Sequence, residues 1–176
     1  MLYGWRGNIK DTVRMAEGRA LSIWGDAGWG ELVKQGKQVE GWFARELVAG
    51  AVDMVKNSWR PEPFPAWVTC VPSLTHPTLV PELAQGIAQA LKLPFIPCIT
   101  KLRPTRPQKE MQNSYQQAHN LAGAYAVKKG LPPGPVFLVD DIVDSRWTMT
   151  VVAALLREAG AVAVLPLALA VATAAE

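Results

Sequence analysis

From residue 67 onward, the chain alternates between runs that are apolar throughout and segments whose apolar residues recur at helical spacing. Continuous apolar runs predict buried strands, and apolar residues repeated every three or four positions predict amphipathic helices. The predicted strands are 67–72, 95–100, 135–143 and 162–170, with a shorter one at 123–127. The predicted helices are 79–92, 112–123 and 149–156, and Gly160 is the expected stop of the last one. Such alternation favours an α/β fold with a parallel twisted sheet and helices on both faces.

The first 66 residues follow a different pattern. They contain five of the seven tryptophans and no long β-branched run, and only 43–58 has clear helical spacing. The proline-rich segment 60–67 is typical of an extended connector. We therefore expect a small N-terminal cap over 1–66 and a core over 67–176, together forming one structural domain.

Composition narrows the class of protein. The chain has 176 residues, of which 49% are hydrophobic and 19% charged, which excludes a disordered or fibrous protein. Cys70 and Cys98 cannot make a disulfide framework, and no Cys/His cluster has zinc spacing. The N-terminus lacks a signal-peptide pattern, and the longest apolar stretch, 161–175, is too short to span a membrane. We expect a soluble protein of a reducing cytoplasm.

The positive charge is concentrated in one segment. The formal net charge is +3, and a surplus of the same size lies between Thr100 and Tyr115. The charged residues there are Lys101, Arg103, Arg106, Lys109 and Glu110. Two interpretations stay open, a solvated flexible loop and a mobile basic loop that closes over an anion.

The candidate chemistry lies in 136–150. A buried strand runs into Asp140 and Asp141, and ligands of parallel sheets bind beyond the carboxyl ends of the strands. Both carboxylates can reach one ligand there, such as a diol or a hydrated Mg²⁺. The turn 144–148 then opens a helix, whose free N–H groups suit a phosphate, and Ser145 and Thr148 add hydroxyl donors. The alternative is an Asp-capped turn that holds no ligand.

This segment resembles the phosphoribosyl-pyrophosphate motif of type I phosphoribosyltransferases. That motif has four apolar residues, two acids, two apolar residues and a short phosphate loop that ends in Thr. The resemblance implies that Asp140 and Asp141 bind the ribose hydroxyls and act as catalytic residues. It also implies a 5′-phosphate site formed by Asp144, Ser145, Arg146, Trp147 and Thr148. The chain departs from the family at Arg146, where Gly is usual because it permits positive φ and close approach to phosphate.

The resemblance extends to the ComF-like branch of the superfamily over about 18–171. It implies a pyrophosphate-binding loop after the first core strand, formed by Pro72, Ser73, Leu74 and Thr75. It also implies a mobile loop that carries Arg103, Arg106 and Lys109. The same tract resembles the phosphoribosyltransferase-like region at the C-terminus of some bacterial RecQ-like DNA helicases.

Three functions follow as hypotheses. The first is a phosphoribosyltransferase that displaces pyrophosphate, with Mg²⁺ held by Asp140 and Asp141 indirectly, through ligand or water. The second is a binding module for a phosphorylated ribose or nucleotide that reports to a helicase domain, and Arg146 favours it. The third is a nucleic-acid accessory domain that uses Arg103, Arg106 and Lys109. A second copy of the chain is a further candidate partner, and no membrane is expected.

One motif is discounted. The segment 30–38 nearly spells a phosphate-binding P-loop, but its glycines are one residue too far apart. Gln38 also stands where Ser or Thr would hold Mg²⁺. We therefore expect no nucleotide hydrolysis from this segment.

Overall fold

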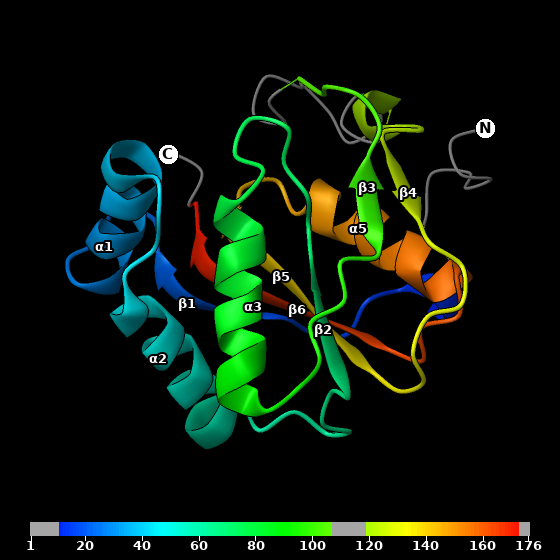
Figure 1. The fold of residues 1–176 in the computed structure, drawn as a ribbon, viewed down its shortest axis with the longest axis horizontal. Coiled ribbons are helices and arrows are strands. Elements are labelled where there is room, and N and C mark those ends of the chain that lie inside the picture. Colours follow the sequence, from blue (N-terminus) through cyan, green and yellow to red (C-terminus); the bar gives the residue numbers. More distant parts are fainter. Residues whose placement is uncertain (1–10, 107–118, 173–176) are drawn as a thin grey trace.

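The centre of the molecule is a four-stranded sheet. The computed structural model describes residues 11–106 and 119–172. The strands β1 (Arg19–Ile23), β6 (Val164–Val171), β5 (Val136–Val143) and β2 (Trp67–Cys70) lie in that order, and every pairing is parallel (Figure 1). Beyond β2, Phe95 makes one further parallel bridge to Val68. Strand β5 is therefore paired on both sides over its first half, and its carboxyl-terminal half extends beyond the end of β2.

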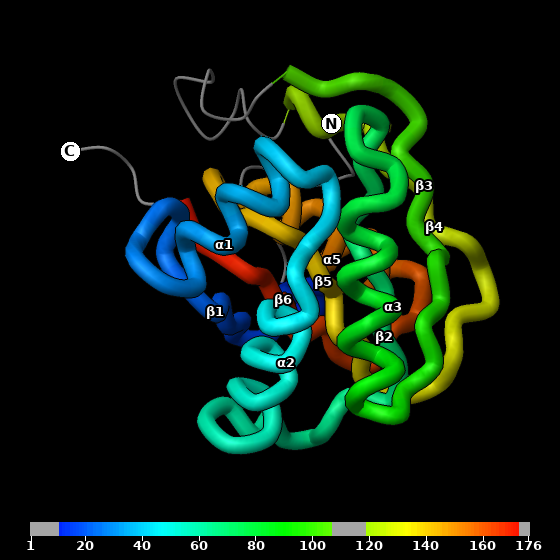
Figure 2. Tube along the Cα trace, turned by 60° about the vertical axis from the view of Figure 1, so that its left-hand side comes forward, coloured from blue at the N-terminus to red at the C-terminus, as the bar shows by residue number. Residues whose placement is uncertain are grey.

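Helices cover both faces of this sheet. One face carries α1 (Trp29–Gln35), α2 (Arg45–Asp53) and α3 (Leu79–Leu91), which lie in front of the strands in Figure 2. Short π-helical turns, Gly36–Glu40 and Met54–Trp59, extend α1 and α2. The other face carries α5 (Trp147–Glu158) and a 3₁₀ turn at Asp11–Val13. The antiparallel pair β3 (Ile99–Lys101) and β4 (Tyr125–Val127) lies beside α5.

Alternate residues of the inner strands supply two hydrophobic clusters. On β5, Phe137 and Val139 pack under α1, α2 and α3, whereas Val136 and Leu138 pack with α5. All four side chains are fully buried. Successive side chains of a strand point to opposite faces, so a strand covered on both faces must be apolar throughout. This is why the continuous apolar runs identified the inner strands.

The predicted α/β fold with a parallel sheet is confirmed. The strands expected at 67–72, 123–127, 135–143 and 162–170 are present, as are the helices expected at 43–58, 79–92 and 149–156. The helix expected at 112–123 falls mainly outside the described residues, and 119–121 is helical.

The strand expected at 95–100 is wrong as one continuous element. Ile96 donates its N–H to the carbonyl of Val68, and the chain then leaves the parallel sheet. Pro97 follows at once and has no N–H to donate to a ladder. Residues Ile99–Lys101 pair instead with β4, antiparallel.

The N-terminal segment contributes directly to the central sheet. Strand β1 pairs with β6, and α1 packs on both of them. Neither element was predicted from the pattern, because β1 is a short edge strand that mixes polar and apolar residues. Its Ser22 hydroxyl donates to the carbonyl of Leu169 across the pair at 2.8 Å. Within the described residues, the segment predicted as a cap thus supplies one strand and two helices of the layered core.

Cys70 and Cys98 are both buried, and neither forms a disulfide. In the part of the chain that the structure describes, no helix has the length and apolarity needed to cross a membrane.

Two helical glycines give a matched test of the packing. A Cβ on Gly30, in α1, would lie 2.0 Å from the carbonyl oxygen of Ile23 in β1, whereas a Cβ on Gly86, in α3, would make ordinary contact with Val48 at 3.4 Å. We expect Gly30→Ala to lower the free energy of unfolding by about 2 kcal/mol or more. Gly86→Ala should raise it by about 0.5–1 kcal/mol, because alanine is the better helix former. Urea unfolding of both variants measures this, and equal effects would contradict the close contact between α1 and β1.

Candidate functional site

The two acids lie in the carboxyl-terminal half of β5, beyond the last residue of β2. Asp140 is level with Ala168 of β6 and is half-buried, and Asp141 is buried with 5% of its surface exposed. Each carboxylate accepts the N–H of the next residue, at 2.8 Å for Asp140 and 2.7 Å for Asp141. Asp141 also forms an ion pair with Lys37 at 2.8 Å. These contacts fix the orientation of both acids.

Both acids line one cavity of about 610 Å³, which we call the carboxylate pocket. Its walls come from the ends of β5 and β2, the start of α5, the β3 end and the turn after α1. It is lined by Lys37, Val71, Pro72, Ser73, Leu74, Thr75, His76, Val80, Lys101, Pro104, Thr105, Arg106, Tyr125, Asp140, Asp141, Ile142 and Thr148. Eight of the residues expected to form the site therefore meet here, from four separate segments.

The loop 72–75 reaches the pocket because β2 and β5 are parallel neighbours. Val71 donates its N–H to the carbonyl of Val139, so the chain leaves β2 beside Asp140. The hydroxyls of Ser73 and Thr75 lie 3.1 Å apart, and the Ser73 hydroxyl accepts the N–H of His76 at 3.2 Å. The loop thus presents two hydroxyl groups next to the two carboxylates.

The turn 144–148 contributes through the helix that it opens. Helix α5 begins at Trp147, and no side chain caps its first N–H groups. Thr148 lines the carboxylate pocket, so this helix end faces it. Asp144, Ser145 and Trp147 do not line the pocket. The backbone start of α5, with the Thr148 hydroxyl, is the part of the expected phosphate turn that reaches the cavity.

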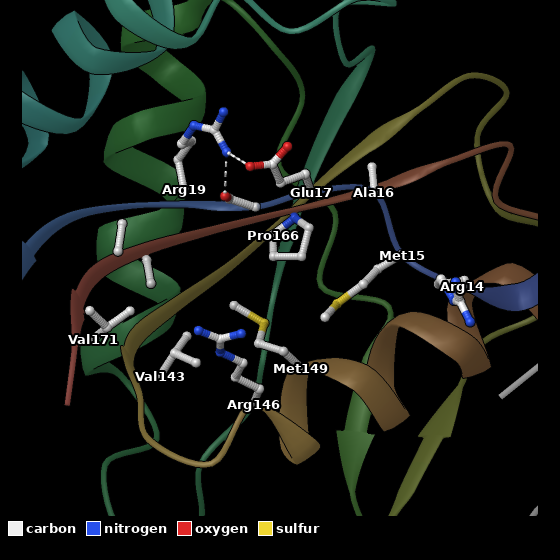
Figure 3. A pocket seen from close by; sticks show the side chains of 13 residues that line it. Arg14, Met15, Ala16, Glu17, Arg19, Val143, Arg146, Met149, Pro166 and Val171 are labelled. Carbon is white, nitrogen blue, oxygen red and sulfur yellow. Dashed lines mark hydrogen bonds and ion pairs between the residues drawn. The ribbon is translucent and has the colours of Figure 1, made fainter. Parts of the chain in front are cut away.

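Arg146 adopts a backbone conformation typical of glycine, and its side chain does not line the carboxylate pocket. Its φ of 63° and ψ of −16° are in the left-handed region. Its side chain lines a second cavity, of about 440 Å³, over β6 and β1 (Figure 3). We call this second cavity the arginine pocket, because Arg14, Arg19 and Arg146 all line it. The guanidinium of Arg146 thus leaves the carboxylate pocket open.

The three cations predicted for the mobile loop, Arg103, Arg106 and Lys109, do not all lie at the pocket. Arg106 lines the carboxylate pocket, and its backbone pairs with the side-chain amide of Asn120 at 3.0 and 2.8 Å. Arg103 donates to the carbonyls of Asn120 and Ala122, so it ties two backbone segments together. Lys109 lies outside the described residues. One of the three predicted loop cations, Arg106, is thus placed at the cavity.

The pocket mixes charges of both signs. Burial raises the pKa of Asp140 well above its usual range, and the neighbouring charge of Asp141 adds to this. Burial lowers the pKa of Lys101, and the nearby Asp140 partly offsets the effect. The ammonium of Lys101 also lies 5.5 Å from the ring centre of Tyr125. Burial raises the pKa of the Cys70 thiol to about 12, so this neighbour of Asp140 is not a nucleophile at neutral pH.

Sequence reasoning missed Lys37 as a member of the site. It lies in the segment that resembles a P-loop imperfectly, in the π-helical turn after α1. Its ammonium reaches Asp141 across more than a hundred residues of sequence. No local pattern marks such a residue, because its position depends on how α1 packs on β1 and β6.

The donor set limits how a metal ion can be held. Among residues 11–106 and 119–172, no three or more His, Cys, Asp or Glu side chains gather at one point. Mg²⁺ typically keeps several waters and binds through one or two carboxylates plus substrate phosphates. The two acids fit that mode of binding and do not form a complete protein cage.

No family model matches the chain, and no curated protein matches it.

The raised pKa of Asp140 predicts how its replacement affects stability. A carboxyl that is harder to ionise in the folded state contributes stability below its ordinary pKa of about 4, and this contribution is lost as the pH rises through the raised pKa. We therefore expect Asp140→Asn to be more stable than the wild type at pH 7, with a difference that shrinks towards pH 4. The amide oxygen of Asn can still accept the N–H of Asp141.

Urea unfolding at both pH values, with EDTA present, measures this difference. Exposed Asp26 is the control, and Asp26→Asn should change the free energy of unfolding by less than about 0.5 kcal/mol, as expected of a surface substitution. A stability gain of Asp140→Asn that grows towards pH 4 would contradict the assignment.

Proposed function

We propose that this protein is phosphoribosyltransferase-like and that its carboxylate pocket binds phosphoribosyl pyrophosphate or the 5′-phosphate end of a nucleotide, with Mg²⁺. One observation carries the proposal. Asp140 and Asp141, the start of α5 and the loop 72–75 all meet in one cavity. A ligand with a diol, a phosphate and a pyrophosphate needs all three groups at once. The proposal includes membership of the ComF-like branch and an association with RecQ-like helicases, and both of these parts rest on sequence resemblance.

The acids suit the ribose. A carboxylate accepts strong hydrogen bonds from hydroxyl groups, and two adjacent hydroxyls match two adjacent carboxylates. Asp141 is held by Lys37 in the free protein, so a ribose hydroxyl would share or replace this contact. Two neighbouring negative charges repel, and hydroxyl donors or a cation relieve the repulsion.

The start of α5 suits the 5′-phosphate. The first N–H groups of a helix lack intrahelical partners, and the helix dipole adds positive potential there. Arg146 holds the turn in the positive-φ conformation that glycine adopts in the related motif. Because its side chain lines the arginine pocket, this departure from the family pattern leaves the phosphate position accessible.

The opposite wall suits the pyrophosphate. The hydroxyls of Ser73 and Thr75 and three cations, Lys37, Lys101 and Arg106, surround the space next to the acids. The low-polarity setting of Lys101 strengthens its attraction for an anion. Bound Mg²⁺ would supply further positive charge to the leaving pyrophosphate.

In an enzyme, the bond between ribose C1 and the pyrophosphate oxygen would break as an acceptor atom binds C1. Positive charge develops on the sugar, and Asp140 and Asp141 would stabilise it through the ribose hydroxyls. The pocket cations would stabilise the leaving group. In a binding module the same contacts would hold the ligand without transfer.

The nucleic-acid hypothesis loses support from the role of Arg103. Its guanidinium is engaged by backbone carbonyls of 120 and 122, so it is not available for phosphate contacts. A DNA-binding surface relies on several free cations. A small phosphorylated ligand therefore fits the described residues better.

The double variant Asp140→Asn/Asp141→Asn tests the site. It keeps the size of both side chains and removes both charges. We expect Mg²⁺-dependent binding of phosphoribosyl pyrophosphate to weaken by about 2–4 kcal/mol, or about 30- to 1,000-fold in Kd. Isothermal titration calorimetry measures the loss. Asp26→Asn/Asp53→Asn is the control, since it removes the same charge from exposed positions.

An unchanged Kd in the site variant, or an equal loss in the control, would overturn the proposal. An assay of pyrophosphate release separates the enzyme from the binding module. The wild type is mixed with phosphoribosyl pyrophosphate, Mg²⁺ and purine or pyrimidine bases. Turnover supports the enzyme, and saturable binding without turnover supports the binding module.

A further inference from the structure

The arginine pocket lies on the opposite face of the sheet from α1, α2 and α3. Helix α5 covers only part of this face, and the cavity opens beside it over β6 and β1. The segment 14–20 forms its outer wall and is attached to the sheet by a hydrogen bond from the Ala16 N–H to the Val164 carbonyl. With about 440 Å³, the cavity has the volume of a small-molecule site.

The walls of the arginine pocket are largely apolar. Met149 of α5 and Met15 of the outer segment enclose it from two sides, and Pro166 of β6 lies between them in Figure 3. Val143 and Val171 close the end near the strand termini. Methionine thioethers are flexible and make favourable contacts with aromatic rings. A flat apolar body suits such a wall.

The rim carries three arginines, and two of them have an acidic partner. Arg14 pairs with Asp11 at 3.1 Å, and Arg19 pairs with Glu17 at 2.6 Å. The backbone carbonyl of Arg146 accepts the N–H of Thr150, but its guanidinium forms no ion pair or hydrogen bond with another residue of 11–106 or 119–172. Its guanidinium reaches the cavity beside Met149 and Val143. One positive charge is therefore left for a ligand.

The backbone of Arg146 makes this residue unusual. Within the described residues, only Arg60, Lys92 and Arg146 combine a side chain with positive φ. Arg60 and Lys92 end helical segments, where the left-handed conformation is common. Arg146 instead precedes a helix, where glycine would adopt its φ of 63° without strain. A residue held in a costly conformation with a free charge over a cavity points to a ligand.

We propose that the arginine pocket binds an aryl anion, an aromatic ring that carries a carboxylate or phosphate, with Arg146 pairing with the anionic group. The ring would lie against Met15, Met149 and Pro166. A guanidinium both binds oxyanions in a fork geometry and stacks on aromatic faces. This site is separate from the carboxylate pocket and does not depend on its proposed ligand. The same turn joins them, since Arg146 lines one cavity and Thr148 the other.

Methionine methyl NMR with 2-naphthoate as the probe tests the site. We expect saturable shifts of the Met15 and Met149 methyl resonances. Met54 packs in the cluster on the other face of the sheet and should not respond. The neutral analogue 2-naphthamide should bind at least about tenfold more weakly, because it lacks the charge that Arg146 would pair with.

The matched variants are Arg146→Gln and Arg60→Gln. Both remove an arginine with positive φ, but Arg60 lines neither pocket. We expect Arg146→Gln to weaken 2-naphthoate binding at least about tenfold and Arg60→Gln to leave it unchanged. Three results would each overturn the proposal: no saturable shift of Met15 and Met149, an equal response of Met54, or unchanged binding by Arg146→Gln.

Discussion

Strand β5 is hydrogen-bonded along its length to β6 and over its first half to β2, and this double pairing governs the geometry of the site. A strand paired on both sides has no freedom to shift its register. Its apolar residues fill both clusters, so the first polar positions, Asp140 and Asp141, must fall where β2 has already ended. The carboxylates therefore lie on a central strand, just past the end of β2, where the loop that follows β2 can reach them.

The carboxylate pocket follows from that constraint together with the chain direction. Because β2 and β5 are parallel, the loop 72–75 and the turn 144–148 leave the sheet at the same edge. The turn after α1 brings Lys37 to Asp141 from a third direction. A buried acid pair is costly without such partners. The cations and hydroxyl groups around the acids offset part of that cost, and they are the groups that the proposed ligand would contact.

The two cavities share one turn. Arg146 holds the positive-φ conformation that starts α5, and its side chain extends over the far face of the sheet. Two residues later, Thr148 faces the acids. Thr148 thus lines a hydrophilic pocket on one side, and Arg146 lines a largely apolar pocket on the other. A substitution at Arg146 acts on one side chain and on one backbone conformation at the same time.

The sequence by itself determined the inner strands, the three longest helices and the acid pair. The burial of a strand or an amphipathic helix determines the local spacing of its apolar residues. That spacing therefore predicted the strand at 135–143 and the helix at 79–92. The motif around Asp140 is contiguous, which made its position at the strand end predictable. Only the tertiary structure decided the role of the N-terminal segment, the partner of Asp141 and the direction of the Arg146 side chain. Strand β1 is short and at an edge, and Lys37 finds its partner, Asp141, more than a hundred residues away in sequence. Such contacts depend on which surfaces meet after the layers have packed, and no local spacing of residues records that.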